Sequence, residues 1–212
     1  SNDLLNFKLF YLYGTFCNNC WLSTISQIIN PITIKFNLIL TRFFSSEPIF
    51  SLQVINFYMN LLMERNKLGK YPKVYAFNTF FYPKLVNSGH ASLKRWTKNH
   101  DLIVVPVHLG VHWCMSIIDF RKKAINYYDS MGHPNQKFSF LFMDKKKVEF
   151  DASGWTLDIP MQMNGSDCGM FACMFAEYLT RGVSITFSQE NMPYFRKKMA
   201  YEILTKQLLE FK

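Results

Sequence analysis

The chain has 212 residues, a length that suits one domain or one domain with an appendage. Its 49% hydrophobic and 17% aromatic content is enough for a packed core and argues against wholesale disorder. The formal net charge of +9 predicts an acidic partner. This partner could be a nucleic acid, an anionic membrane or an acidic protein. The basic residues form short clusters, which are more often only solvated faces, and none carries a nucleic-acid motif. We therefore expect no nucleic acid, and an acidic protein fits at least as well.

The five cysteines are too few and too scattered for a disulfide scaffold. Cys17 and Cys20 form a CxxC pair, but no second pair of ligands follows, so we expect no metal site. Cys114 and Cys173 lie in apolar runs and are predicted to be core residues.

The N-terminal region differs from the rest of the chain. Residues 9–34 contain no charged side chain, but Pro31 and several polar residues interrupt them. A membrane-spanning helix needs about 20 mostly apolar residues, so we expect no membrane span. We also find no clean signal peptide. We therefore separate a divergent segment, residues 1–52, from a folded domain, residues 53–212.

The folded domain begins with helical patterns and continues with strand patterns. Apolar residues recur at helical spacing from Val54 to about Asn66, and shorter helices are predicted at 79–86 and 91–98. Three apolar or alternating runs with turns between them then predict an antiparallel meander. These runs are residues 102–107, 112–119 and 124–129.

The C-terminal part returns to helical patterns. Residues 134–157 are predicted to form a loop, and helices are predicted at 168–180 and 193–209. Pro193 suits the first turn of the second of these helices. A helix, then a sheet, then further helices indicates an α+β fold.

Cys168 is the candidate nucleophile. It follows the turn-rich residues 164–167 and precedes the apolar run 170–179, which places it at the start of a helix. The helix dipole and the free amides there favour a thiolate, and Gly169 lets a substrate backbone approach closely. Small buried cysteines also begin helices for structural reasons, so this feature alone does not distinguish a nucleophile from a core residue.

His112 and Asp129 are the candidate base and its orienting carboxylate. Pairing of their two predicted strands brings Asp129 level with His112, where it would stabilise the imidazolium. A lone strand histidine is more often structural, and His108 is a rival. Trp113 favours His112, because an aromatic residue beside the base can wall a narrow substrate channel. Asp129 could alternatively cap a turn.

Gln162 is the candidate oxyanion donor. Its side-chain amide and the backbone N–H of Cys168 could together stabilise the developing negative charge of an acyl-transfer reaction. A glutamine in a polar loop is usually only solvated. A thiol, an imidazole, a carboxylate and an amide in this order nevertheless predict a cysteine protease.

Much of the chain, from about residue 53 to residue 210, resembles the sentrin-specific proteases. These are the Ulp-type cysteine proteases that mature and remove the small modifier SUMO. The stretches that match this family are residues 54–62, 76–81, 94–98, 105–108, 111–113, 119–123, 128–132, 163–171 and 192–199.

The resemblance implies roles for nine residues. His112, Asp129 and Cys168 match the catalytic triad, Gln162 the oxyanion residue, and Trp113 one wall of the tunnel that holds the di-glycine tail of the modifier. Four other residues match positions on the modifier-binding face: Phe80, Arg95, Lys98 and His108.

The resemblance also implies a papain-like fold of the Ulp type, with a central mixed or antiparallel sheet flanked by helices. It implies SUMO precursors and SUMO-conjugated proteins as partners, no metal or organic cofactor, a monomer and a nuclear location. SUMO presents an acidic face to such proteases, which would explain the basic charge.

The chain departs from the family pattern at its N-terminal side. The family has a Trp-Leu-Asn-Asp-Glu segment whose tryptophan forms the opposite tunnel wall, whereas residues 49–53 read Ile-Phe-Ser-Leu-Gln. Residues 1–48 lack the usual opening strand and helix, and 134–157 lack a longer helical segment. We therefore expect reduced activity. The alternatives are a catalytically weakened SUMO-binding homologue and a protease for a related modifier such as NEDD8.

Overall fold

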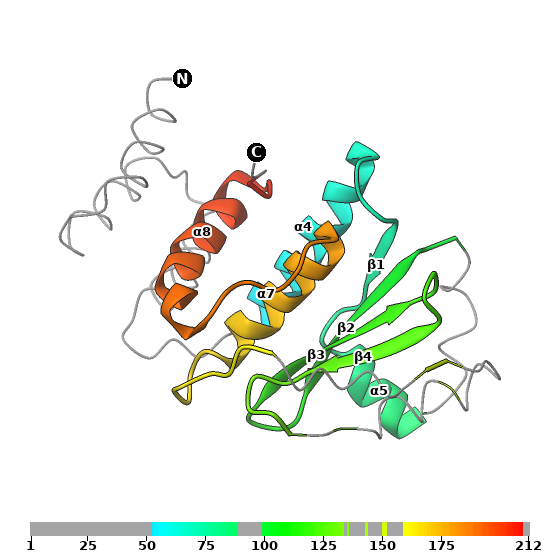
Figure 1. The fold of residues 1–212 in the computed structure, drawn as a ribbon, viewed down its shortest axis with the longest axis horizontal. Helices are drawn as coiled ribbons and strands as arrows, with labels where there is room; N and C mark the ends of the chain where they lie inside the picture. The colour runs from blue at the N-terminus through cyan, green and yellow to red at the C-terminus, as the bar shows by residue number, and fades with distance from the viewer. Residues whose placement is uncertain are drawn as a thin grey trace. The chain divides into compact units, whose positions relative to one another are not determined.

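The computed structural model describes residues 52–88, 99–133, 135, 143, 150–151 and 159–209 (Figure 1). The N-terminal segment, the predicted helix at 91–98 and most of the predicted loop at 134–157 lie outside these residues. The domain boundary at residue 52 therefore stays a prediction. Within the described part of the chain, no helix is both long and apolar enough to span a membrane.

Four of the predicted helices are confirmed, with shifted ends. They are α4 (Leu52–Arg65), α5 (Phe81–Ser88), α7 (Cys168–Arg181) and α8 (Met192–Thr205), and the short turns η2 (Asn66–Leu68) and η4 (Gln189–Asn191) accompany them. The prediction that the last helix runs to residue 209 is wrong. Lys206 adopts a left-handed backbone with φ of 55°, which ends α8 at Thr205.

Among the described residues, the sheet has four strands in the order β1-β2-β3-β4. Strands β2 (Leu102–His108), β3 (Trp113–Asp119) and β4 (Ala124–Tyr128) form the predicted antiparallel meander. Strand β1 (Val74–Ala76) was not predicted and pairs in parallel with β2. It is too short for an alternating pattern to be recognised in the sequence.

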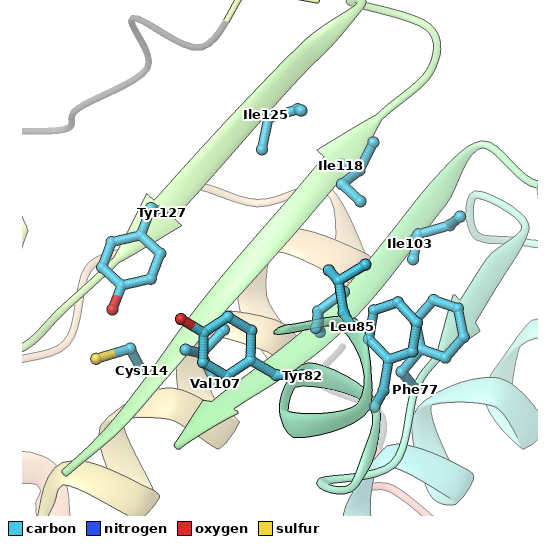
Figure 2. Packing of buried hydrophobic residues seen from close by; sticks show 11 residues of the cluster. Phe77, Tyr82, Leu85, Ile103, Val107, Cys114, Ile118, Ile125 and Tyr127 are labelled. Carbon is cyan, nitrogen blue, oxygen red and sulfur yellow. The ribbon is translucent and has the colours of Figure 1, made fainter. Parts of the chain in front are cut away.

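The two faces of this mixed sheet are covered by different helices. Alternate residues of β2, Ile103, Val105 and Val107, belong to one buried cluster with Tyr82 and Leu85 of α5 (Figure 2). Because side chains alternate along a strand, the intervening residues of β2 point to the opposite face of the sheet. There the sheet packs against α7 and α4 (Figure 1).

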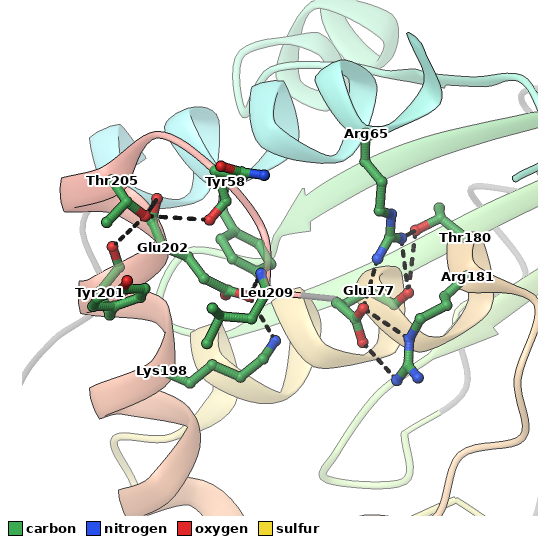
Figure 3. A network of polar contacts seen from close by, with 11 residues as sticks. Tyr58, Arg65, Glu177, Thr180, Arg181, Lys198, Tyr201, Glu202, Thr205 and Leu209 are labelled. Atoms are coloured by element: carbon green, nitrogen blue, oxygen red, sulfur yellow. Dashed lines mark hydrogen bonds and ion pairs between the residues drawn. The ribbon is translucent and has the colours of Figure 1, made fainter. Parts of the chain in front are cut away.

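A buried ion pair connects α4 to α7. The Arg65 Nη1 atom lies 2.7 Å from Glu177 Oε1, and its Nη2 atom donates to Thr180 Oγ1 at 2.8 Å (Figure 3). All three residues are buried. Arg181 also donates to Glu177. Burial by itself would raise the pKa of Glu177, but the surrounding cations, Lys198 foremost, lower it and keep the carboxylate ionised.

A second polar group connects α8 to α4. Lys198 Nζ lies 2.8 Å from Glu202 Oε1, and the Tyr58 hydroxyl donates to Glu202 Oε2 at 3.1 Å (Figure 3). All three side chains are buried. Specific polar contacts therefore set how α4, α7 and α8 pack on one another, in addition to their apolar surfaces.

We expect Arg65→Met to lower the free energy of unfolding by about 3 kcal/mol, because it leaves the buried Glu177 carboxylate without its partner on α4. Urea denaturation followed by circular dichroism measures this change. Lys67→Met is the matched control. Lys67 pairs with Glu64 at the surface, where its side chain is 72% exposed, so this loss should stay below about 1 kcal/mol. Equal losses in the two variants would contradict the prediction.

Candidate active site

Three segments that are distant in sequence supply the candidate site. His112 lies immediately before β3, Asp129 immediately after β4, and Cys168 is the first residue of α7. Because β3 pairs with β4 and packs against α7, these three positions meet at one end of the sheet.

His112 and Asp129 form a direct hydrogen bond. The Nε2 atom of His112 lies 2.5 Å from Oδ1 of Asp129, and both side chains are buried. The strand register explains the contact. Met115 of β3 pairs with Tyr128 of β4, so the start of β3, which His112 precedes, and the end of β4, which Asp129 follows, lie at the same end of the antiparallel pair. Asp129 Oδ1 also accepts the backbone N–H of Met131 at 2.8 Å. The predicted pairing of the base with the carboxylate is thus observed.

This environment favours the charged forms of both groups. Burial alone would lower the pKa of His112, but the Asp129 carboxylate and the nearby Cys114 and Cys168 thiols raise it to about 12. Burial would raise the pKa of Asp129, and the hydrogen bonds from His112 and Met131 lower it instead. The Asp129 carboxylate therefore favours the cationic form of the imidazole.

Cys168 occupies the predicted helix start and interacts with His112. Burial would raise the pKa of the Cys168 thiol, but His112 and the backbone N–H groups of Trp113 and Gly169 lower it. Nδ1 of His112 makes no hydrogen bond of ordinary geometry among the described residues, and Nε2 is occupied by Asp129. Nδ1 is thus the ring nitrogen left for the thiol, and the pair can exist as thiolate and imidazolium.

Gln162 lies beside the site, with its amide already in hydrogen bonds. Its Oε1 accepts the Ser130 hydroxyl at 2.6 Å, and its Nε2 donates to the Asn164 carbonyl at 2.6 Å. The Gln162 backbone N–H donates to the Ser130 carbonyl at 2.9 Å. Gln162 is therefore fixed to the segment that follows Asp129, and its NH₂ group is directed toward the loop before Cys168.

Trp113 and the rival histidine, His108, lie side by side. Their ring centroids are 4.2 Å apart, and they face each other across the β2–β3 pair. Burial, and then the charge of His112, lowers the pKa of His108. The neutral form of His108 is thus favoured, whereas His112 is hydrogen-bonded to the Asp129 carboxylate and interacts with the Cys168 thiol. Of the two histidines, His112 is the one that the structure shows hydrogen-bonded to a carboxylate, whereas its role as the base stays a prediction.

The predicted binding residues are only partly described. Phe80 lies just before α5 and is 62% exposed, an unusual position for a large aromatic side chain. Arg95 and Lys98 lie outside the described residues, so their assignment to a binding face stays a prediction.

Two residues near the site were not recognised as such from sequence. Cys114 was predicted as a core residue, and it is buried, but its thiol also interacts with His112 and Tyr127. Its position two residues after His112 in the predicted strand 112–119 could have indicated this contact, because alternate residues of a strand share a face. Asp167 lies directly before Cys168, and its buried carboxylate pairs with Arg196 of α8. No sequence pattern indicated that pair, because the partners lie on different elements.

The donor atoms of His112, Cys114 and Asp129 lie within 4.8 Å of one another, a grouping that can hold a metal ion. The 2.5 Å contact between His112 Nε2 and Asp129 Oδ1 leaves no space for an ion between these two atoms. Zinc ligands stand about 2 Å from the ion, so their mutual separations are longer than this contact. The geometry is that of a hydrogen bond.

The Ulp1 protease family, C-terminal catalytic domain, matches residues 49–208 of the chain. A sentrin-specific protease of Caenorhabditis elegans is 49% identical over 175 residues, which are 74% of this chain and 25% of the relative. Human sentrin-specific protease 2 is 46% identical over 176 residues, 74% of this chain and 30% of the relative. The chain thus spans less than a third of the length of these relatives.

Solved structures show the same fold. The C-terminal Ulp1 protease domain, in its complex with SMT3, the yeast ortholog of SUMO, matches with a TM-score of 0.65 and 28% identity over 80% of this chain and 82% of that chain. Ulp1 with its catalytic cysteine oxidised to a sulfonic acid matches with a TM-score of 0.67 and 29% identity, covering 80% and 84%. The predicted α+β fold of the Ulp type is confirmed.

We expect Cys168 to react with iodoacetamide well below the usual pKa of a thiol, because only the thiolate reacts and His112 stabilises it. Asp129→Asn removes the charge that stabilises the imidazolium. The pKa of Cys168 should then rise, and alkylation at pH 6 should slow by about tenfold. Peptide mass mapping locates the modified cysteine.

His133→Asn is the control for this experiment. His133 lies 3.7 Å from the other Asp129 oxygen, but its side chain is 72% exposed. Cys168 in this variant should be alkylated at pH 6 as fast as in the unmodified chain. If Asp129→Asn reacts as fast as the unmodified chain at pH 6, the imidazolium does not lower the pKa of Cys168.

Proposed function

Because the chain belongs to the Ulp1 protease family, we propose that it is a SUMO-specific thiol protease that cleaves after the C-terminal di-glycine of SUMO. The cleaved bond is a peptide bond in a SUMO precursor or an isopeptide bond to a lysine of a conjugated protein. The first observation in support is the 46–49% identity to sentrin-specific proteases over 74% of the chain.

The observation that best supports this proposal from the structure is the His112–Asp129 pair beside the Cys168 thiol at the start of α7. These groups supply a nucleophile, a base and an orienting carboxylate within one buried site. The side chains come from three segments that are distant in the sequence, so it is the fold that brings them together.

In the proposed reaction, the Cys168 thiolate attacks the carbonyl carbon of the last glycine of SUMO. The negative charge that develops on the carbonyl oxygen would be held by the Cys168 backbone N–H and the Gln162 side-chain amide. Gln162 Nε2 donates to the Asn164 carbonyl in the free protein, so the oxyanion would take over a donor that is already oriented.

The tetrahedral intermediate then collapses to a thioester. His112, as the imidazolium, protonates the leaving amine, and the C–N bond breaks. The now neutral His112 removes a proton from water, which attacks the thioester and releases the SUMO carboxyl group, whose remaining proton passes to the solvent. The Cys168 thiolate and the imidazolium are restored, so no external reagent besides water is consumed.

Charge and exposed apolar surface support binding to an acidic protein. The net charge of +9 would speed the encounter with such a partner and make it sensitive to salt. Phe80 offers an exposed aromatic contact, and we propose it as part of the binding face together with Arg95, Lys98 and His108. Trp113 would wall the tunnel for the di-glycine tail. The monomeric state and the nuclear location stay predictions from the resemblance.

The second candidate function is SUMO binding with weak catalysis. It is favoured by residues 49–53, which read Ile-Phe-Ser-Leu-Gln where the family has the tryptophan of the second tunnel wall. Loss of that wall would weaken the hold on the di-glycine tail without changing His112 or Cys168. A protease for NEDD8 is a further alternative.

A SUMO vinyl sulfone probe separates these functions. We expect the unmodified chain to form a covalent adduct, seen as a mass shift, and Cys168→Ala to form none while still binding SUMO in a pull-down. Cys173→Ala is the matched control, because Cys173 is fully buried in the same helix and should label normally. Tight SUMO binding without labelling would support the binding homologue. Faster hydrolysis of a fluorogenic NEDD8 substrate than of the SUMO substrate would overturn the assignment to SUMO.

Gln162→Ala should lower kcat for a fluorogenic SUMO substrate by about a hundredfold, because one oxyanion donor is lost. KM should change little, since this donor acts mainly in the transition state. Gln207→Ala, which removes an exposed amide at the end of the chain, should leave kcat unchanged. A kcat for Gln162→Ala within a factor of about two of the unmodified chain would show that Gln162 is not a donor to the oxyanion.

A further inference from the structure

Asp167 occupies the N-cap position of α7 without capping it. An aspartate at this position normally accepts a hydrogen bond from one of the first free backbone N–H groups of its helix. The Asp167 carboxylate makes no such bond. The residue is nevertheless only 5% exposed, so its charge is satisfied by other groups inside the protein.

The carboxylate is held by three side chains. Arg196 of α8 donates to Oδ1 through Nε at 3.0 Å and also through Nη2. Oδ2 accepts the amides of Gln189 and Asn164, each at 2.7 Å. Burial would raise the pKa of Asp167, but these donors lower it, so the group is an anion paired with the Arg196 cation.

Two of these side chains, Gln189 of η4 and Arg196 of α8, also bind the backbone of the loop before Cys168. Gln189 Oε1 accepts the Met163 N–H at 2.8 Å, and Arg196 Nη2 donates to the Ser166 carbonyl at 3.3 Å. Arg196 therefore contacts the backbone and the side chain of the two residues directly before Cys168.

This arrangement affects the charge at Cys168. The first backbone amides of α7 stay unoccupied by Asp167, and the Gly169 N–H contributes to lowering the pKa of the thiol. The charged side chain that lowers the pKa of this thiol is His112, which is hydrogen-bonded to Asp129. A free carboxylate one residue before Cys168 would oppose a thiolate and an oxyanion alike.

We propose that Arg196 is a positioning residue of the active site. It holds the Asp167 carboxylate away from the start of α7 and neutralises it, so that the Gly169 amide remains available to the thiolate and no free negative charge lies beside the Cys168 amide that would hold the oxyanion. The part that concerns the oxyanion rests on the proposed protease function, whereas the part that concerns the thiolate does not.

The test uses Arg196→Met, which keeps an apolar stem and removes the charge. Asp167 would then be free to accept the α7 amides. We expect alkylation of Cys168 by iodoacetamide at pH 6 to slow by about tenfold, and kcat for a fluorogenic SUMO substrate to fall at least as much, with a smaller change in KM. Lys197→Met is the matched control. Lys197 is the exposed neighbour of Arg196, so this substitution removes one positive charge from α8 without removing the partner of Asp167.

A second substitution separates this role from a purely structural one. Adding Asp167→Asn to Arg196→Met removes the released charge, so the alkylation rate should return toward that of the unmodified chain. Arg196→Lys, which keeps the cation, should retain most of the reactivity. An unchanged alkylation rate in Arg196→Met, or no recovery in the double variant, would overturn the proposal. Alkylation requires no SUMO substrate, so it tests the proposal separately from the proposed function. If the proposed function were wrong, the unmodified chain would not hydrolyse the SUMO substrate, but the alkylation rates of the variants would still differ as expected.

Discussion

The packing of α7 against the sheet is the contact on which the site depends. β3 begins directly after His112, and α7 begins at Cys168. The position of α7 on the sheet therefore determines the distance between the Cys168 thiol and the His112 imidazole. Successive helical residues point about 100° apart, so a small rotation of α7 would carry the thiol away. The buried bonds from Arg65 to Glu177 and Thr180 resist such a rotation at the far end of the same helix.

Three buried carboxylates show how partners determine what an acid does. Asp129 faces a histidine and stabilises a cation beside the thiol. Glu177 faces arginines and joins α4 to α7. Asp167 stands closest to Cys168 in the chain, yet Arg196 and two amides hold it. All three have lowered pKa values, because in each case the hydrogen bonds and nearby cations outweigh burial.

Much of the fold could be predicted from sequence where the signals were local. The helix that starts at Cys168 and the hairpin that joins His112 to Asp129 both follow from apolar periodicity and turn residues. Strand β1 was missed because three residues are too few to show an alternating apolar pattern. Its parallel pairing is with β2, which lies far along the chain. The environment of Asp167 was missed for the same reason, since Arg196 and Gln189 reach it only after α7 and α8 have packed. The roles of Arg95 and Lys98 rest on resemblance alone.

The dispersal of the site over three segments makes chemical reactivity a late product of folding. A nascent chain that has passed residue 129 already carries the histidine and the aspartate, but it has no nucleophile until Cys168 is made and α7 docks. Before docking, the sulfur has the acidity of an ordinary cysteine and sits far from any base. The proposed cleavage chemistry would therefore arise only once α7 has packed against β3.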